Sequence, residues 1–269
     1  MDMDFTYRAY RDLLTAAKEN GYELLTVDEY LTRDELPEQL LVMRHDVDRK
    51  VENALDMAEI EAALGVSSSY YFRAIDKTYD PEIFRRVSEL GHEVGYHYED
   101  LDTADGDLVA ARRSFERNLE RFREHVPVDT VSMHGNPLTP HDNRDVVESI
   151  DLEAYDLSGE VYLSFDFSEV VYFSDTNRTW YEEKTIVNDW PVGPSEKPTQ
   201  VESTEELIDL LGEQSIPHLY LLVHPNRWAD STAEWAIEYS KDIVTNGGKW
   251  GLWAVRSLRG DDQSGDSVV

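Results

Sequence analysis

The sequence predicts an α/β fold made of parallel strand–helix units in one domain, and three observations support this prediction. Short apolar runs alternate at short spacing with stretches of helical periodicity, which is the pattern of βα units. The chain has 269 residues, a normal length for one α/β barrel. Hydrophobic residues make up 41% of the chain, which is enough for a sizeable core.

The first half of the chain contains the clearest elements. "FTYRAYRDLLTAAKEN" has helical spacing and stops at Gly21, a residue type common at helix ends. The apolar run "LLVM" marks a buried strand, and Asp80 followed by Pro81 marks a helix start. The expected elements are a helix at 5–20, a short strand or a turn with a helix at 22–31, a strand at 39–48, a helix at 50–65, a strand at 66–75, a helix at 80–90, a strand at 92–99, a helix at 105–125 and a strand at 130–135.

The second half of the chain is less regular. Residues 160–175, "EVYLSFDFSEVVYFSD", alternate in polarity as antiparallel or irregular strands do. The remaining expected elements are a Pro-rich loop at 189–204, a helix at 203–214, a buried strand at 217–225 and a last helix at 231–248. The polar tail at 260–269 is expected to be disordered, which leaves a single domain at 1–259.

The chain is strongly acidic, with 56 Asp and Glu against 25 Lys and Arg and a net charge of -31. Such a surface repels nucleic acid and anionic membranes, so we expect neither as a partner. The acids are spread along the chain, and Lys is scarce. This composition resembles that of proteins from salt-accumulating archaea, because molar salt screens charge repulsion to within about 3 Å.

Several classes of protein are excluded by composition. The chain has no cysteine, which rules out disulfides, thiolate metal sites and cysteine nucleophiles. It has no apolar run of about 18 residues, so we expect no membrane insertion. The acidic N-terminus lacks the basic and apolar regions of a secretory signal, and we therefore expect a cytoplasmic protein.

Imidazoles and carboxylates recur where the predicted strands end. Ligands of parallel α/β folds bind at the carboxyl ends of the strands. The residues at those ends are Asp46 and Asp48, then Arg73, then His97 with Glu99, then His134, and finally His224. Because side chains alternate along a strand, Asp46 and Asp48 share one face while His45 takes the other. His92, five residues before His97, faces away from it by the same rule.

Two imidazoles and a carboxylate make a sensible set of ligands for a divalent transition metal. We expect Zn²⁺ first, with Co²⁺ or Ni²⁺ as alternatives. Asp46 and Asp48 supply a carboxylate pair, one to bind the ion and one to take a proton from water. His97 and His134 supply imidazole ligands, and His224 remains as a general acid.

The chain resembles polysaccharide deacetylases of the NodB-homology, carbohydrate esterase 4 (CE4) type. The segment "GHEVGYHYEDL" matches the first half of one family motif, and "LYLLVHP" resembles the last. "RHDVD" occupies the place of the family's carboxylate pair, and "SMHGNP" falls where the family carries its Arg-Pro motif; the resemblance runs from about Leu40 to Trp228. It implies a distorted, incomplete (β/α) barrel. It also implies a metal-dependent enzyme in which His97 is the first metal histidine and His224 is the general acid.

The chain departs from that family at two ligand positions. The family's carboxylates are usually adjacent, and a literal alignment places Asp46 on the base and Val47 on the ligand. The strand-face argument makes Asp48 the ligand instead. The family's second metal histidine would fall at Leu101, which cannot bind a metal, so we prefer His134. The family's Arg-Pro motif is absent.

Structural interpretations compete with these roles. Asp46 or Asp48 could cap the helix that begins near Val51. Each histidine could simply end its strand, and Glu99 with Asp100 could belong to the solvated acidic surface. The expected substrate-binding residues are Arg73, Asn136 and Trp228. Arg73 could instead pair with a carboxylate, and Trp228 could be a packing residue rather than a ring that stacks on a sugar.

The sequence therefore predicts a metal-dependent hydrolase that removes an acyl group from a carbohydrate or glycan precursor. In this hypothesis Asp48, His97 and His134 hold the ion. Asp46 is the base and His224 the acid. One alternative is an amidase that acts on another C–N bond. A second alternative is a catalytically silent carbohydrate-binding protein of the same fold.

Overall fold

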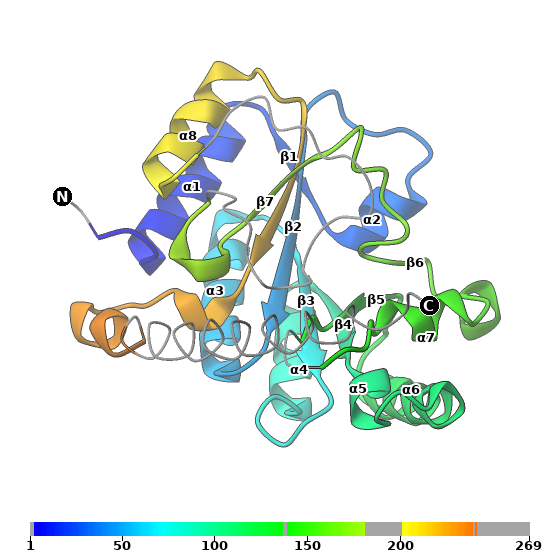
Figure 1. Cartoon of the computed structure of the whole chain (residues 1–269). Coiled ribbons are helices and arrows are strands. Elements are labelled where there is room, and N and C mark those ends of the chain that lie inside the picture. Colours follow the sequence, from blue (N-terminus) through cyan, green and yellow to red (C-terminus); the bar gives the residue numbers. More distant parts are fainter. Residues whose placement is uncertain (1–2, 137–138, 181–200, 239, 241–269) are drawn as a thin grey trace, which may run out of the picture.

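The computed structural model describes residues 3–136, 139–180, 201–238 and 240. Its strands form one eight-stranded sheet in the order β6-β5-β4-β3-β2-β8-β7, with β1 beside the first part of β2. All pairings between these strands are parallel. The sheet curls into a half-barrel with helices around it, as Figure 1 shows. This architecture confirms the predicted α/β fold with a distorted (β/α) barrel.

The elements follow one another along the chain as strand–helix units. The strands are β1 (Glu23–Leu25), β2 (Leu40–Val47), β3 (Ser69–Arg73), β4 (Glu93–Tyr98), β5 (Thr130–Met133), β6 (Gly159–Glu160), β7 (Val171–Ser174) and β8 (His218–Val223). The helices are α1 (Tyr7–Glu19), α2 (Val27–Thr32), α3 (Val51–Leu64), α4 (Pro81–Glu89), α5 (Asp100–Thr103), α6 (Leu108–Arg123), α7 (Arg144–Glu148) and α8 (Thr204–Glu213). Three short 3₁₀ helices are η1 (Glu153–Tyr155), η2 (Thr176–Arg178) and η3 (Pro225–Arg227).

The central strand β2 is buried along its whole length. Its odd-numbered residues, such as Leu41 and Met43, pack in a core cluster with residues of α1 and α8, which lie side by side (Figure 1). Its even-numbered residues face the inside of the curl. A central strand buried on both faces reads as a nearly continuous apolar run. Of its polar exceptions, Arg44 and Asp46 point inward and His45 points outward, toward Glu61 of α3.

The helix boundaries follow local signals in the sequence. Asp80 caps α4 through the backbone N–H groups of Glu82 and Ile83, and Pro81 occupies the first turn. Gly65 ends α3 in the left-handed conformation, with φ of 67°. These features confirm the helix start predicted at Asp80 and the helix end predicted at Gly65.

Two expected elements differ in the structure. Residues 160–175 do not form antiparallel strands, because β6 pairs in parallel with β5, and β7 pairs in parallel with β8. The segment between them is irregular. The helix expected at 105–125 is preceded by a separate short helix, α5, and begins at Leu108. For residues 160–175, the alternation of polarity could not distinguish parallel from antiparallel pairing, because partner strands are set by long-range packing.

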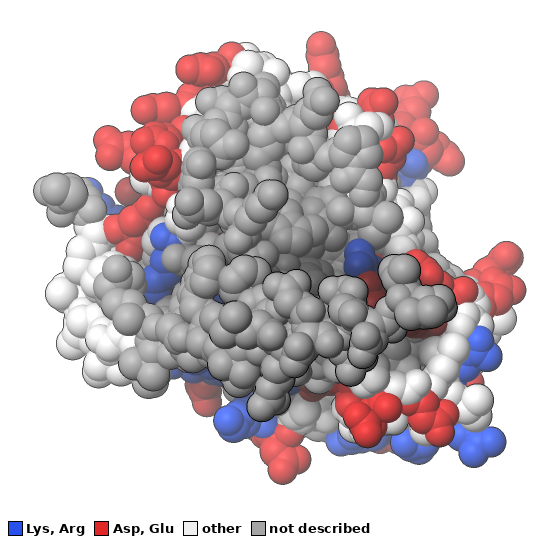
Figure 2. Space-filling view, in the orientation of Figure 1, with Lys and Arg blue, Asp and Glu red and all other residues white. Residues whose placement is uncertain are grey.

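Parts of the remaining predictions lie outside the described residues. They include residues 189–200 of the Pro-rich loop, 241–248 of the last helix and the tail at 260–269, so the domain boundary at 259 stays a prediction. Of the helices that the structure describes, none is long and apolar enough to cross a membrane. Figure 2 shows Asp and Glu side chains around much of the described part of this face, with fewer Lys and Arg.

Candidate metal centre

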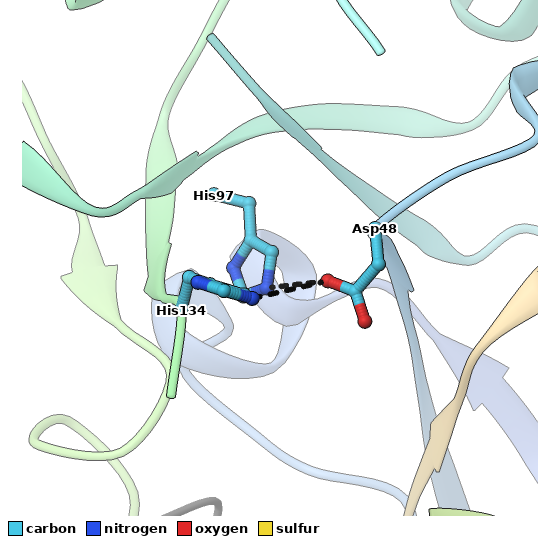
Figure 3. A group of neighbouring side chains, drawn as sticks. All are labelled: Asp48, His97 and His134. Atoms are coloured by element: carbon cyan, nitrogen blue, oxygen red, sulfur yellow. Dashed lines mark ion pairs between the residues drawn. The ribbon is translucent and has the colours of Figure 1, made fainter. Parts of the chain in front are cut away.

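Asp48, His97 and His134 come from three strands of the sheet and point toward one another (Figure 3). Asp48 follows the last residue of β2, His97 lies near the end of β4, and His134 directly follows β5. Because the strands are parallel, their carboxyl ends share one edge of the sheet. The curl of the sheet brings Asp48 across the end of β3 to the two histidines.

The three side chains converge through one ligand atom each. Asp48 Oδ1 lies 3.6 Å from His97 Nε2 and 3.6 Å from His134 Nε2. The three ligand atoms all lie within 4.8 Å of one another. A separation of 3.6 Å is too long for a hydrogen bond. Asp48 Oδ1 is buried and makes no hydrogen bond with any described residue, so it is an acceptor that still needs a partner.

The ring of His97 is oriented by the backbone of the next strand. Its Nδ1 lies 3.0 Å from the Ser132 carbonyl oxygen in β5. A carbonyl can only accept, so Nδ1 carries a proton, and Nε2 is the ring nitrogen that faces Asp48. A carbonyl or carboxylate partner on the second ring nitrogen is the usual arrangement for a metal-binding histidine.

Asp46 lies beside this cluster and is fixed by Arg44. The guanidinium donates from Nε to Oδ1 at 2.8 Å and from Nη2 to Oδ2 at 2.5 Å, and both side chains are buried. Asp46 Oδ2 is 3.5 Å from His97 Nε2. Burial raises the pKa of Asp46, but the charges of Arg44 and His97 outweigh it and leave the pKa below its usual value. Asp46 is therefore an ionised carboxylate with a fixed orientation.

Asp48 is also ionised. Burial raises its pKa, but the contact with His97 and the charges of His134 and His224 have the larger effect and hold the pKa well below its usual range. The cluster therefore offers one carboxylate and two imidazole nitrogens.

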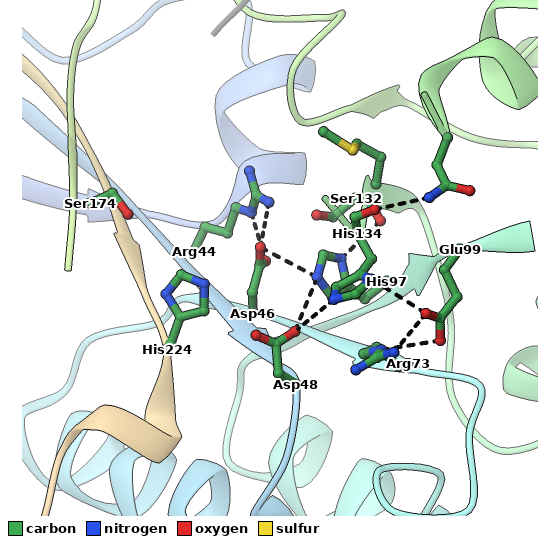
Figure 4. Close-up of polar contacts among 12 residues, drawn as sticks. Arg44, Asp46, Asp48, Arg73, His97, Glu99, Ser132, His134, Ser174 and His224 are labelled. Carbon is green, nitrogen blue, oxygen red and sulfur yellow. Dashed lines mark hydrogen bonds and ion pairs between the residues drawn. The ribbon is translucent and has the colours of Figure 1, made fainter. Parts of the chain in front are cut away.

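His224 reaches the same edge of the sheet from β8 (Figure 4). Its Nδ1 lies 2.6 Å from Asp175 Oδ1, and its backbone N–H donates to Asp175 Oδ2 at 2.8 Å. Asp175 also accepts from Arg227 at 2.8 Å and from Trp228 Nε1 at 2.9 Å. Burial raises the pKa of Asp175, but His224 and Arg227 outweigh it and lower the pKa to about 2. The ionised Asp175 holds the Nδ1–H of His224, which leaves Nε2 for chemistry.

The five residues with predicted metal or catalytic roles, Asp46, Asp48, His97, His134 and His224, meet at one edge of the sheet. Their individual roles stay predictions. Of the expected substrate-binding residues, Arg73 lies at the same edge and forms two hydrogen bonds with Glu99, at 3.1 and 2.6 Å. Asn136 is half-buried in the loop after β5.

Trp228 cannot stack on a sugar in this structure, which corrects the sequence prediction. Its side chain is fully buried. It packs edge-on against Phe5 and Tyr10, with ring centroids 5.1 Å away in both cases, and its Nε1–H bonds to Asp175. Trp228 therefore supports the partner of His224 and offers no ring face to a ligand.

Two structural interpretations of the sequence are also wrong. Neither Asp46 nor Asp48 caps α3, because the N-cap is Lys50 in the left-handed conformation, with no side-chain capping bond. Glu99 and Asp100 do not belong to the solvated surface. Glu99 is 14% exposed and contacts Arg73 and His134, and Asp100 is buried and accepts from the hydroxyl of Tyr96.

Sequence reasoning missed Arg44 and Asp175 as members of this site, and it placed Glu99 at a strand end without giving it a role. Arg44 did leave a signal, since it stands two residues before Asp46 on the same face of an otherwise apolar strand. Asp175 follows β7, a segment whose pairing the sequence did not reveal. Its only signal was a carboxylate at the end of an apolar run, "VVYFSD".

The donor set fits a divalent transition metal. Two imidazoles with one carboxylate, at a partly buried site with His97 already oriented, suit Zn²⁺, Co²⁺ or Ni²⁺ better than Mg²⁺ or Ca²⁺, which prefer oxygen ligands. The buried Asp48 Oδ1, without a hydrogen-bond donor among the described residues, is the atom that a cation would satisfy.

Comparisons with known proteins find only distant likenesses. No family model matches the chain, and no curated protein matches it in sequence. Among solved structures, a CE4 family pseudoenzyme from Bacillus anthracis superposes with a TM-score of 0.44 and 11% identity, over 80% of this chain and 63% of the pseudoenzyme chain. This chain thus spans less than two thirds of that protein.

Two further structures show similar values. A family 4 carbohydrate esterase from Streptomyces lividans, in complex with acetate, has a TM-score of 0.42 and 11% identity, over 80% of this chain and 91% of the esterase chain. The peptidoglycan deacetylase PdaC from Bacillus subtilis has a TM-score of 0.38 and 12% identity, over 83% and 97%. At these values the likenesses assign no function.

Proposed function

We propose that this chain is a metal-dependent hydrolase that removes an acyl group, such as acetyl, from a carbohydrate or glycan precursor. One observation carries the proposal: Asp48, His97 and His134 converge beside a second carboxylate, Asp46, while His224 stands on the other side of the carboxylate pair. A metal site flanked by a base and an acid is the set that hydrolysis of an amide or ester requires. The carbohydrate substrate is inferred from the resemblance of the sequence to CE4 deacetylases.

Asp48, His97 and His134 would hold the ion. A bound divalent ion would polarise the acyl carbonyl and make water a stronger acid. Asp46 has the geometry of a general base, because Arg44 fixes both of its oxygens and keeps it ionised. It would take a proton from the attacking water.

His224 would return a proton to the departing nitrogen or oxygen of the sugar. Asp175 orients its ring through Nδ1, so the proton to be donated is held at Nε2. Base and acid thus come from β2 and β8, which are neighbouring strands, and each is held by a charged partner in the interior. The position of the family's second metal histidine is taken here by Leu101, a buried core residue, and we assign its role to His134.

The proposal is tested with the full chain purified in molar salt. We expect about one transition metal ion per chain, and release of acetate from N-acetylated oligosaccharides that depends on the ion. Bound metal with hydrolysis of amides but no release of acetate from sugars would favour the alternative amidase. A chain that binds oligosaccharides without bound metal or turnover would contradict the hydrolase and support the silent carbohydrate-binding protein.

A further inference from the structure

The two histidines of the metal centre are oriented in different ways. His97 uses the backbone carbonyl of Ser132, within the ladder between β4 and β5. His134 lies one residue past the end of β5. Its Nδ1 is buried and makes no well-aligned hydrogen bond with any described residue. A metal-binding imidazole normally donates from its second nitrogen, so His134 needs an acceptor from elsewhere.

The carboxylate of Glu99 lies where that acceptor is needed. Glu99 Oε2 is 3.3 Å from His134 Nδ1, on the side of the ring away from Asp48 (Figure 4). The side chains of Glu99 and His134 are 14% and 16% exposed. Glu99 follows β4 directly, two residues after His97, so β4 contributes to the environment of both histidines.

Glu99 is itself held in place by Arg73, at the end of β3. The guanidinium donates from Nε to Oε1 at 3.1 Å and from Nη2 to Oε2 at 2.6 Å, a two-pronged pairing that fixes the plane of the carboxylate. Arg73 is 18% exposed. The strands β3, β4 and β5 therefore supply a chain of contacts from Arg73 through Glu99 to His134.

We propose that Glu99, held by Arg73, is the positioning residue that fixes the ring of His134 for metal binding. The Glu99 carboxylate accepts the Nδ1–H of His134, and this leaves Nε2, which lies 3.6 Å from Asp48 Oδ1, as the nitrogen that binds the ion. The inference rests on the proposed metal centre and deepens it. Glu99 and Arg73 do not bind the ion; they act through His134.

Two substitutions at Glu99 separate the role of its acceptor from that of its size. Glu99→Met removes the acceptor and keeps a side chain of similar length, while Glu99→Gln keeps a neutral acceptor. Glu89→Gln in α4, whose side chain is 67% exposed, is the control for loss of a negative charge elsewhere. Arg73→Met removes the support of Glu99 and leaves its carboxylate in the chain.

The first readout is the tautomer of His134 in the metal-free protein, from imidazole ¹⁵N NMR at a pH where the rings are neutral. We expect the Nδ1–H tautomer in the wild type, Glu99→Gln and Glu89→Gln, and a shift toward Nε2–H in Glu99→Met. His97 is an internal control, because its carbonyl partner does not involve Glu99. An unchanged His134 tautomer in Glu99→Met would overturn the proposal.

The second readout is zinc affinity, measured by competition with a chelator. Removing a partner of a metal-binding histidine typically weakens binding about 10- to 100-fold. We expect a loss in that range for Glu99→Met, a smaller one for Glu99→Gln and Arg73→Met, and none for Glu89→Gln. Wild-type affinity in Glu99→Met would contradict the inference. If Glu99→Met does not fold, wild-type affinity in Arg73→Met would contradict it.

Failure of the metal centre is distinguishable from failure of this inference. If His134→Ala binds zinc as tightly as the wild type, His134 is not a ligand and the proposed metal centre is wrong at that residue. The tautomer experiment contains no metal, so it still shows whether Glu99 orients the ring.

Discussion

A cluster of one carboxylate and two histidines lies on each side of the sheet. In the outer cluster the polar atoms are satisfied by the protein, and we call it closed; in the inner cluster the facing atoms lack partners among the described residues, and we call it open. On the inner face are Asp48, His97 and His134. On the outer face Glu61 of α3 lies 3.2 Å from His45 Nε2 and 3.3 Å from His92 Nδ1. Strand alternation separates the two sets, since His92, directly before β4, and His97, within β4, are five residues apart and so lie on opposite faces.

The outer cluster is closed, because its polar groups are satisfied by the protein. Glu61 accepts from the hydroxyls of Tyr10, Ser68 and Tyr70. His92 Nε2 lies 2.9 Å from the Ala58 carbonyl, and His45 Nδ1 lies 3.3 Å from that of Ser69. Glu61, His45 and His92 are at most 5% exposed. Hydroxyl donors occupy the carboxylate oxygens that a metal would need.

The inner cluster also has one carboxylate and two histidines, but the atoms that face one another there lack hydrogen-bond partners in the described part of the chain. Its two Nε2 atoms and Asp48 Oδ1 face one another without hydrogen bonds, and no hydroxyl of the described residues donates to Asp48 Oδ1. Residue identity therefore does not distinguish a buried structural cluster from a candidate metal site. The difference lies in whether donor atoms converge while still lacking partners.

Substituting one histidine from each cluster, His97 in β4 and His92 directly before it, gives the largest expected contrast. His97→Ala should weaken zinc binding more than about 100-fold, beyond what loss of a supporting residue costs. His92→Ala should keep zinc affinity and lower the free energy of unfolding by about 1–3 kcal/mol, because it leaves buried polar groups unpaired. Metal titration and denaturant unfolding of both variants provide the comparison. Equal zinc affinity in the two variants would remove the distinction between the faces.

Asp46→Asn tests the division of labour within the inner face. We expect intact metal content and a loss of turnover of about 10²- to 10⁴-fold, the usual contribution of a general base. Asp48→Asn should instead lower metal affinity. Metal analysis and acetate release are measured on the same preparations, and full turnover in Asp46→Asn would exclude Asp46 as the base.

The outer cluster predicts a pH-dependent stability through Glu61. Burial raises the pKa of Glu61, but His45 and His92 outweigh it and lower the pKa from 4.5 to about 2. The stabilisation is therefore fully present above about pH 4.5 and is lost as the pH falls toward 2, a change of about 3 kcal/mol. The difference in unfolding free energy between the wild type and Glu61→Gln should shrink by this amount over that range. A difference that is independent of pH would contradict the assignment.

Trp228→Phe is expected to have the smallest effect on the site, because it changes stability alone. It removes the Nε1–H that Asp175 accepts at 2.9 Å and keeps an aromatic ring against Phe5 and Tyr10. A hydrogen bond to a charged acceptor contributes about 1.5–3 kcal/mol. We expect a loss of unfolding free energy in this range, with unchanged affinity for zinc and for oligosaccharides. A selective loss of oligosaccharide affinity would return Trp228 to a substrate-binding role.

The positions of the site residues could be predicted because they follow from local rules. A buried run that ends in "HDVD" places Asp46 and Asp48 on one face, and parallel strands bring His97, His134 and His224 to the same edge. The partners could not be predicted in this way. Asp175 depends on the parallel pairing of β7 with β8, and the burial of Trp228 depends on Phe5 and Tyr10, more than 200 residues away in the chain.

Glu99 shows the same limit on a smaller scale. Its place after β4 was evident, but an acidic residue in a very acidic chain is most often solvated. Only the positions of Arg73 and His134, at the ends of the two strands that flank β4, distinguish it from the other carboxylates.

The central claim is that side chains from β2, β4 and β5 bind one cation together, and a crystal structure with zinc tests it most directly. Anomalous scattering at the zinc edge locates the ion without assumptions about the protein. We predict a single strong site with Asp48, His97 and His134 about 2.0–2.2 Å from the ion, and Asp46 and His224 nearby but not bound to it. Zinc held elsewhere, or held at this edge without His134, would contradict the account.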